Sequence, residues 1–378
     1  MTDVHDLGRG LPGALVYEGL IAGDSGRWDA AHGAARKMAG HRIAAHPGAG
    51  LFFGAPAVAF ALHAVGHPAY GAALATLDES VASLVSARLA AANRRMGSGQ
   101  PPRMREFDLI SGLTGLGAYL LHAGSRPGLL CEVLDYLVRL LTQPVRVCGE
   151  QVPGWWTSDC PAGDPDDGAG HANFGLAHGL AGPVALVALA ARAGHLVPGQ
   201  RQALAASCGL LEQWAQPAPG GAAWPETLPL DAWLAGPTGA FREGRPSWCY
   251  GSPGIARSLQ LAAIACGQDT VRARAEEVLA ECLGDPVQLA RITDLTVCHG
   301  WAGLCLAADR AAADAPVSSP LRRMLPGLHS EFTTRLAADA LPSTSGLLTG
   351  VDGVLLADRT LRTSRPVPTG WATCLLLT

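Results

Sequence analysis

Uncharged stretches of small and aliphatic residues recur along the chain, and each follows a Gly-x-x-Gly turn. Successive first glycines lie 49 to 72 residues apart, which is enough for two helices and their connections. The earliest copy is weaker, because Ala57 stands where the second glycine is expected. The pattern predicts six helical hairpins, whose turns begin at Gly54, Gly112, Gly179, Gly251, Gly300 and Gly350.

The apolar stretch after each turn is long enough for a buried helix. Several of these stretches stop at a glycine, which can close a helix in the left-handed conformation without steric cost. More polar stretches with one apolar face alternate with them. One example places Val271, Ala275, Val278, Leu279 and Cys282 on one face, with Arg272, Arg274, Glu276 and Glu277 away from it. The apolar helices are predicted at 58–65, 116–123, 184–193, 255–266, 304–313 and from 354 onward.

Apolar inner helices surrounded by amphipathic outer helices indicate an all-α fold. We expect an (α/α)6 double toroid with six inner and about six outer helices, as a single domain over residues 1–378. An open solenoid is the alternative, but it would need polar capping repeats, and the sequence has none. In a closed ring the turns share one rim, where each inner helix would present its N-terminus and free N–H groups.

Composition narrows the classes of function. The chain is 48% hydrophobic and 16% charged, so it can bury a large core, and its net charge of −4 predicts neither nucleic-acid binding nor membrane insertion. The N-terminus lacks a basic segment followed by an apolar one, and ten cysteines stand at irregular spacing. We therefore expect reduced thiols and a cytoplasmic protein, with peripheral attachment to a complex at the membrane as an open alternative.

Two of the turns follow metal-type ligands. Cys249 precedes the turn at Gly251, and Cys298 and His299 precede the turn at Gly300. Buried cysteines often only pack, but two cysteines and a histidine at matched repeat positions favour one zinc ion. Three protein ligands leave a tetrahedral ion one open position, as in catalytic sites. Two thiolates and a neutral imidazole cancel the charge of Zn²⁺, which favours activation of an incoming sulfur over hydrolysis.

Three further residues are candidates for chemistry on the same rim. His178 could donate or accept a proton, although a lone histidine beside glycines is often structural. Asp108 could orient His178 or simply cap its own loop. Arg245 could hold a carbonyl or enolate oxygen or remain a solvated cation. Trp248, Tyr250 and Trp301 are expected to pack, and also to wall the cavity.

Long connections at 149–173 and 217–245 are too long for simple turns, and loops of that length often carry recognition or form a lid. The basic segment from Arg94 to Arg105 is most simply a solvated linker, with contact to a peptide as the alternative.

Taken together, these motifs resemble the lanthipeptide cyclases of the LanC family over most of the chain. The resemblance implies a double α-toroid with zinc on Cys249, Cys298 and His299. A substrate cysteine would take the open position and add to dehydroalanine or dehydrobutyrine, giving a lanthionine or methyllanthionine ring. By position His178, Asp108 and Arg245 match catalytic residues of the family. The matching motifs include Gly175-Leu176-Ala177-His178-Gly179, Trp248-Cys249-Tyr250-Gly251, Cys298-His299-Gly300 and Leu348-Thr349-Gly350.

The resemblance also implies partners. No region of dehydratase length precedes the expected toroid, which is typical of the stand-alone cyclases. Such an enzyme would act on a dehydrated precursor peptide with its leader, supplied by a separate dehydratase. A zinc protein that binds glutathione or a protein partner without cyclising is the alternative, and a metal-dependent hydrolase is more distant because the predicted site is rich in thiolate.

Overall fold

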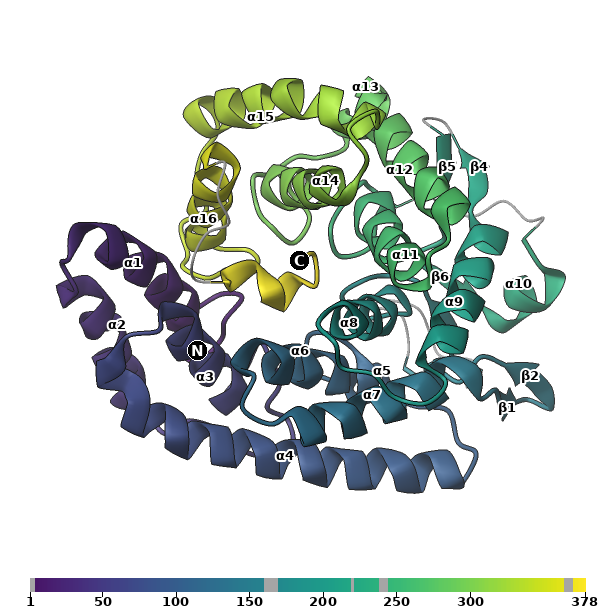
Figure 1. Ribbon diagram of the computed structural model, residues 1–378, viewed down its shortest axis with the longest axis horizontal. Coiled ribbons are helices and arrows are strands. Elements are labelled where there is room, and N and C mark those ends of the chain that lie inside the picture. Colours follow the sequence, from purple (N-terminus) through teal and green to yellow (C-terminus); the bar gives the residue numbers. More distant parts are fainter. Residues whose placement is uncertain (1–3, 160–168, 219–220, 238–243, 364–369) are drawn as a thin grey trace.

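The protein folds into two concentric layers of helices, as the computed structural model shows (Figure 1). The structure describes residues 4–159, 169–218, 221–237, 244–363 and 370–378. Strands are few and short, and the all-α toroid predicted from the sequence is confirmed. None of the helices in these ranges is both long and apolar enough to cross a bilayer.

The inner layer is a closed ring. Each inner helix contacts the next along the chain, and α16 returns to contact α1, so that no open end remains as in a solenoid. The ring consists of α1 (Leu11–Ser25), α3 (Ala55–Val65), α6 (Leu113–Ala123), α8 (Ala181–Arg192), α11 (Ser252–Cys266), α14 (Trp301–Asp314) and α16 (Val351–Arg362).

The inner ring therefore has seven described helices, one more than the sixfold repeat predicted. The additional helix α1 follows Gly10-Leu11-Pro12-Gly13, a Gly-x-x-Gly turn that the sequence analysis overlooked near the start of the chain. Helix α1 packs against both α3 and α16 and so joins the two ends of the chain. The described residues therefore contain seven copies of the repeated unit, whereas the sequence pattern predicted six.

Inner helices also begin about three residues earlier than the apolar pattern predicted. Helices α11 and α14 start directly after Gly251 and Gly300, which are their N-cap residues in extended conformation. The second glycine of each turn therefore lies in the first helical turn. There a Cβ atom on Gly254 or Gly303 would stand 2.0 or 1.9 Å from a main-chain oxygen of the preceding loop, so only glycine fits.

The predicted helix ends are confirmed. Gly66, Gly124, Gly194 and Gly267 all adopt positive φ, and three of them directly follow the last residue of an inner helix. The left-handed conformation lets the chain leave the helix without the steric clash that a Cβ atom would cause.

Amphipathic helices form the outer layer, as predicted. In α12 the predicted apolar face is buried, but Glu276, expected to point away, is buried as well. Its carboxylate accepts a hydrogen bond from Gln260 Nε2 at 3.0 Å, which compensates its burial. The outer helices are α2 (Asp29–Ala39), α4 (Gly71–Gly97), α7 (Pro127–Thr142), α9 (Gln200–Trp214), α12 (Asp269–Gly284) and α15 (Pro320–Ala338), and short helices are η1 (Pro68–Tyr70), α5 (Met104–Phe107), α10 (Leu230–Ala235) and α13 (Pro286–Ala290).

The two long connections fold into small antiparallel pairs. Their tryptophans pack together: Trp155, Trp156 and Trp224 are buried, and Trp233 stacks on Trp214 of α9 with ring centroids 5.1 Å apart. Parts of both connections, 160–168, 219–220 and 238–243, lie outside the described residues, and the predicted role in recognition stays a prediction. The strands pair as β1 (Val145–Val147) with β2 (Glu150–Val152), β3 (His171–Asn173) with β6 (Thr227–Pro229), and β4 (Gln216–Ala218) with β5 (Gly221–Ala223).

The loops on one rim are joined by main-chain hydrogen bonds into a second ring. Each loop donates an N–H to a carbonyl of the loop that follows it in the chain, and the last loop donates back to the first. The seven links are Leu7 to Phe52, Phe52 to Ile110, Leu109 to Ala177, Leu176 to Cys249, Cys249 to Cys298, Cys298 to Leu348 and Leu347 to Leu7, with N···O distances of 2.8 to 3.4 Å.

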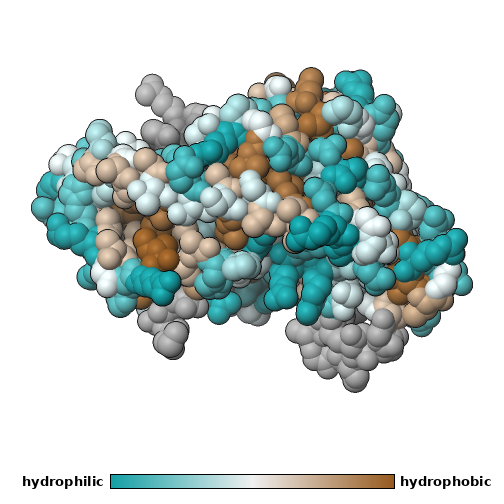
Figure 2. Space-filling view, turned by 90° about the horizontal axis from the view of Figure 1, so that it is seen from below, coloured by the Kyte–Doolittle hydropathy of each residue, from teal (hydrophilic) through white to brown (hydrophobic). Residues whose placement is uncertain are grey.

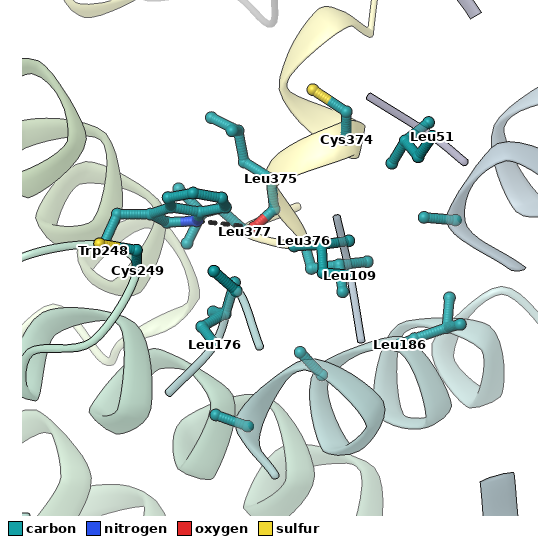
Figure 3. Close-up of a cluster of buried hydrophobic side chains, with 14 of the residues drawn as sticks. Leu51, Leu109, Leu176, Leu186, Trp248, Cys249, Cys374, Leu375, Leu376 and Leu377 are labelled. Atoms are coloured by element: carbon teal, nitrogen blue, oxygen red, sulfur yellow. Dashed lines mark hydrogen bonds between the residues drawn. The ribbon is translucent and has the colours of Figure 1, made fainter. Parts of the chain in front are cut away.

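The C-terminal segment fills the centre of the toroid. At the end of the short 3-10 helix η2 (Trp371–Leu375) and directly after it, the side chains of Leu375, Leu376 and Leu377 are almost fully buried (Figure 3). Trp248 Nε1 donates to the Leu375 carbonyl at 2.9 Å. The tail therefore packs directly under the loop that carries Cys249.

A buried arginine fixes the end of this segment. Arg257 of α11 donates from Nε and Nη2 to the Leu377 carbonyl at 3.1 and 2.8 Å, and Nη2 also bonds Asp314 at 2.7 Å. A charge taken out of water must be paired and hydrogen-bonded, and both conditions are met here.

We expect Leu377→Ala to lower the free energy of unfolding by about 2–5 kcal/mol, because it opens a cavity at the centre of the ring. Urea unfolding followed by circular dichroism measures the change. Thr378→Ala, one residue further and exposed, is the control and should leave the midpoint in place. Equal midpoints for the two variants would show that the tail does not anchor the core.

Candidate metal centre

Three of the predicted residues meet on the rim. One ligand atom each from Cys249, Cys298 and His299 lie within 4.8 Å of one another. Cys249 comes from the loop that enters α11, and the other two come from the loop that enters α14. The loops are held together because Cys249 N donates to the Cys298 carbonyl at 3.3 Å. Residues 49 positions apart thus form one cluster.

The protein already stabilises negative charge on this cluster. Hydrogen bonding from the Cys298 thiol, opposed by burial and assisted by His299 and Ser247, holds the pKa of Cys249 well below its usual range. The neighbouring Cys249 sulfur and burial raise the pKa of Cys298, and the positive charge of Arg245 opposes this rise. Without a metal, the pair favours one thiolate that shares a proton with the second sulfur.

A bound cation would replace the proton that the two sulfurs share, and the donor atoms are those that bind zinc. Two sulfurs and an imidazole nitrogen are the ligand types that Zn²⁺ prefers, and a coordinating thiol gives up its proton. The cluster is also accessible, since Cys298 and His299 are only partly buried. These three residues therefore can hold the predicted ion and leave one side open.

Ser247 supports the first of the sulfurs and was not foreseen from the sequence. Main-chain N–H groups of Tyr250 and Gly251 donate to Ser247 Oγ at 3.3 and 3.2 Å. With these acceptor positions in use, the hydroxyl proton is available to Cys249 Sγ, 3.6 Å away. The hydroxyl is buried, so water does not compete for it.

Asp294 supports the histidine and was also missed. Its Oδ2 lies 3.4 Å from His299 Nε2. Its Oδ1 accepts from the main-chain N and the hydroxyl of Thr296 at 2.8 and 2.6 Å, which fixes the carboxylate. A carboxylate beside one ring nitrogen orients a histidine so that the other nitrogen faces the metal. Asp294 precedes His299 by five positions, a spacing that carries no recognised signal.

The predicted histidine and aspartate pair is present. His178 Nδ1 and Asp108 Oδ2 are 2.6 Å apart, and Asp108 Oδ1 accepts from Ser111 N at 2.7 Å. Burial lowers the pKa of His178. The hydrogen bond and charge of Asp108, together with a contribution from Cys249, raise this pKa by more than burial lowers it, so the net shift is upward. Asp108 therefore contacts His178 and also bonds its own loop. Its role in catalysis stays a prediction.

Tyr250 lies beside this pair. Its ring centroid is 6.1 Å from that of His178, and its hydroxyl accepts a hydrogen bond from Asn173 Nδ2 at 3.1 Å. Burial, opposed by Asn173 and assisted by nearby negative charges, raises the pKa of Tyr250 to about 12. The phenol stays protonated at neutral pH and can donate its own proton.

The remaining predicted residues take different places. Arg245 lies close enough to Cys298 for its charge to lower the pKa of that thiol, as a cation beside the site should. Trp248 and Trp301 are buried and pack, Trp301 under the guanidinium of Arg335 at 4.5 Å. Trp301 also lines a hollow beside Met324 and Leu328 of α15.

The sequence and the fold both have known relatives. The profile of the lanthionine synthetase C-like proteins matches residues 6–376. A comparison with curated protein sequences found no significant match. Among solved structures, nisin cyclase superposes with a TM-score of 0.79 at 20% identity, covering 100% of this chain and 93% of that one. At this identity the likeness establishes the toroid.

We expect Asp294→Asn to weaken zinc binding by about 10- to 100-fold, the usual cost of losing a carboxylate that supports a ligating histidine. The amide oxygen can still accept from Thr296, so the loop should keep its shape. Competition with a chromophoric chelator measures the affinity. Asp285→Asn, which preserves the cap of α13, is the control. Unchanged affinity in Asp294→Asn would remove Asp294 from the site.

Proposed function

The chain belongs to the lanthionine synthetase C-like family, and from this premise we propose that it is a zinc-dependent lanthipeptide cyclase. Its substrate would be a dehydrated precursor peptide with a cysteine and a dehydroalanine or dehydrobutyrine. The cysteine sulfur forms a bond to the β-carbon, the thiol proton leaves, and a proton is added at the α-carbon. The product is an isomer of the substrate, so no co-reactant is needed.

The observation that carries this proposal is the cluster of two sulfurs and one imidazole on an accessible rim. When bound there, zinc would supply a place for a third sulfur and keep it as a thiolate at neutral pH. Cys249, Cys298 and His299 would hold the ion. A site with two anionic ligands offers little positive charge for activating water, which supports sulfur chemistry over hydrolysis.

The neighbouring residues would handle the proton and the developing charge. His178, whose pKa is raised by the hydrogen bond and charge of Asp108, keeps its proton to higher pH than an ordinary histidine and would deliver it to the α-carbon. Asp108 would fix the ring so that Nε2 faces the substrate, since Nδ1 is bonded to the carboxylate. Arg245 and the Tyr250 hydroxyl would stabilise the enolate oxygen.

We further propose the setting of this reaction. The precursor would arrive with its leader from a separate dehydratase, because the proposed addition consumes a dehydroamino acid and does not make one. The enzyme would work in the cytoplasm, either free or peripherally attached to a complex at the membrane.

Incubation with a dehydrated precursor should consume one peptide thiol for each ring without changing the peptide mass. Alkylation with N-ethylmaleimide followed by mass spectrometry counts the thiols that remain. Cys298→Ala should slow their loss by at least about 100-fold, because removing a ligand costs more than removing a residue that only supports one. Cys148→Ala, an exposed cysteine far along the chain from the site, should react like the wild type.

The same assay separates the cyclase from a zinc protein that only binds thiols. Persistence of every peptide thiol with the zinc-loaded wild type, while glutathione still binds and Cys298→Ala abolishes that binding, would contradict cyclisation and support the binder.

Asp108→Asn should move the alkaline limb of the pH profile of kcat/KM to lower pH. The substitution removes the hydrogen bond and charge that raise the pKa of His178 and leaves the burial that lowers it. His178 would then lose its proton at lower pH, and the acid form would be scarcer at neutral pH. Asp135→Asn, an exposed aspartate on α7, should leave the limb in place. An unmoved limb in Asp108→Asn would exclude His178 as the acid.

A further inference from the structure

A groove rich in arginine lies beside the rim. It runs between the C-terminal half of α4 and the segment that leads into α6, with a volume of about 540 Å³. Figure 2 looks onto the face covered by α4, where strongly hydrophilic side chains gather near the middle of the surface. We call this the arginine groove; its lining includes Arg88, Arg95, Arg103, Arg105, Glu106 and Ser111.

The groove carries positive charge on an acidic protein. Its four arginines and one glutamate give 4 − 1 = +3, whereas the whole chain has a net charge of −4. The concentration of one sign in a concave surface attracts ligands of the other sign.

Two of the four arginines already have carboxylate partners. Arg95 bonds Glu106 at 2.6 Å, and Tyr136 donates to the same carboxylate at 2.7 Å. Arg103 bonds Asp159 at 2.6 Å. These two pairs shape the walls, and their charges largely cancel.

Neither Arg88 nor Arg105 forms an ion pair with a carboxylate in the described part of the chain, although the charge of Asp108 acts on Arg88. The guanidinium of Arg88 donates to three carbonyl oxygens, those of Pro47, Ala49 and Ser111, none of which carries a full charge. Arg105 is exposed, and no carboxylate among the described residues pairs with it. Burial has the largest effect on the pKa of Arg88 and lowers it; the negative charge of Asp108 opposes this, and the smaller effect of the Arg105 charge lowers the pKa further. The two cations therefore repel each other across the groove. A carboxylate between them would relieve that repulsion.

The groove shares part of its wall with the loop that carries Asp108. Ser111 contributes to its wall, and the main-chain N–H of Ser111 donates to Asp108, whose other oxygen holds His178. Arg105 itself precedes Asp108 by three residues. A peptide held in the groove would therefore continue onto the rim where the sulfur ligands lie.

We propose that the arginine groove binds an acidic segment of the peptide substrate and anchors it while a cysteine elsewhere in the same peptide reaches the metal centre. This inference rests on the proposed function for the identity of the peptide. Guanidinium groups bind carboxylates in paired hydrogen bonds, so a segment with two or more Asp or Glu residues matches Arg88 and Arg105.

A binding experiment on the zinc-loaded full chain tests this assignment. The probe is a fluorescein-labelled peptide with the sequence Asp-Leu-Glu-Ser repeated three times, and its control is the amide analogue with Asn and Gln. Fluorescence anisotropy should show tighter binding of the acidic peptide, weakening as sodium chloride is raised. Arg105→Glu should raise its Kd by about tenfold or more, because a paired charge becomes a repulsive one.

Arg94→Glu is the matched control. Arg94 is an exposed arginine on α4 that does not line the groove, so both variants change the net charge equally. An equal loss of affinity in the two variants, or equal binding of the acidic and amide peptides by the wild type, would overturn the proposal. So would single-stranded RNA of twelve nucleotides if it bound more tightly than the peptide and depended equally on Arg105.

Kinetics distinguish this inference from the proposed function. With a cyclisable peptide that carries an acidic segment, Arg105→Glu should raise KM and leave kcat unchanged, and replacing the acidic residues by amides should abolish the difference. If neither change alters the kinetics of cyclisation, the proposed role of the arginine groove is contradicted, and the proposed cyclase function is not affected. If the acidic peptide binds in a way that depends on Arg105 but every peptide thiol remains free, the cyclase proposal is contradicted and the groove proposal is still supported.

Discussion

The closed ring of main-chain hydrogen bonds on the rim determines where the chemistry can occur. Each loop gives at least one N–H to its neighbour, and the last loop gives three to the first, so that the position of every loop depends on the others. Cys249 and Cys298 are themselves members of this ring through their backbone atoms. Their sulfurs are therefore placed by backbone geometry, which is stiffer than side-chain packing alone, and a preorganised set of ligands follows.

The glycines make this arrangement possible. Where an inner helix starts, its first turn lies against the carbonyl of the loop before it, and Gly254 and Gly303 leave no room for a Cβ atom. Close approach brings the helix N-termini up to the rim, where their N–H groups favour the negative charge of a thiolate or an enolate. The repeated glycines are thus required for close packing, and the same packing places the partial positive charge of the helix N-termini at the site.

Much of this could be predicted from the sequence, because the informative residues are local and repeated. The apolar helices and their glycine ends follow from the pattern around each turn. So do the three candidate ligands, Cys249, Cys298 and His299, which the structure brings together. The seventh inner helix escaped because its turn stands at the very start of the chain. Ser247, Asp294 and Asn173 escaped for another reason: each acts through one hydrogen bond or charge contact fixed by the loop conformation, and polar residues in loops carry no period that would mark them.

The centre of the toroid has a further consequence for how the molecule folds. Leu375, Leu376 and Leu377 occupy the middle of the inner ring, and the Leu377 carbonyl accepts hydrogen bonds from the buried Arg257. The hydrogen bonds that hold this segment join residues 120 or more positions apart in the sequence. Contacts of such long range must close large loops and therefore form slowly. Before the segment packs, the axis of the ring is unfilled and Arg257 is bonded only to Asp314 and Gln260. We therefore expect the centre of the ring to order after the local pairs of helices.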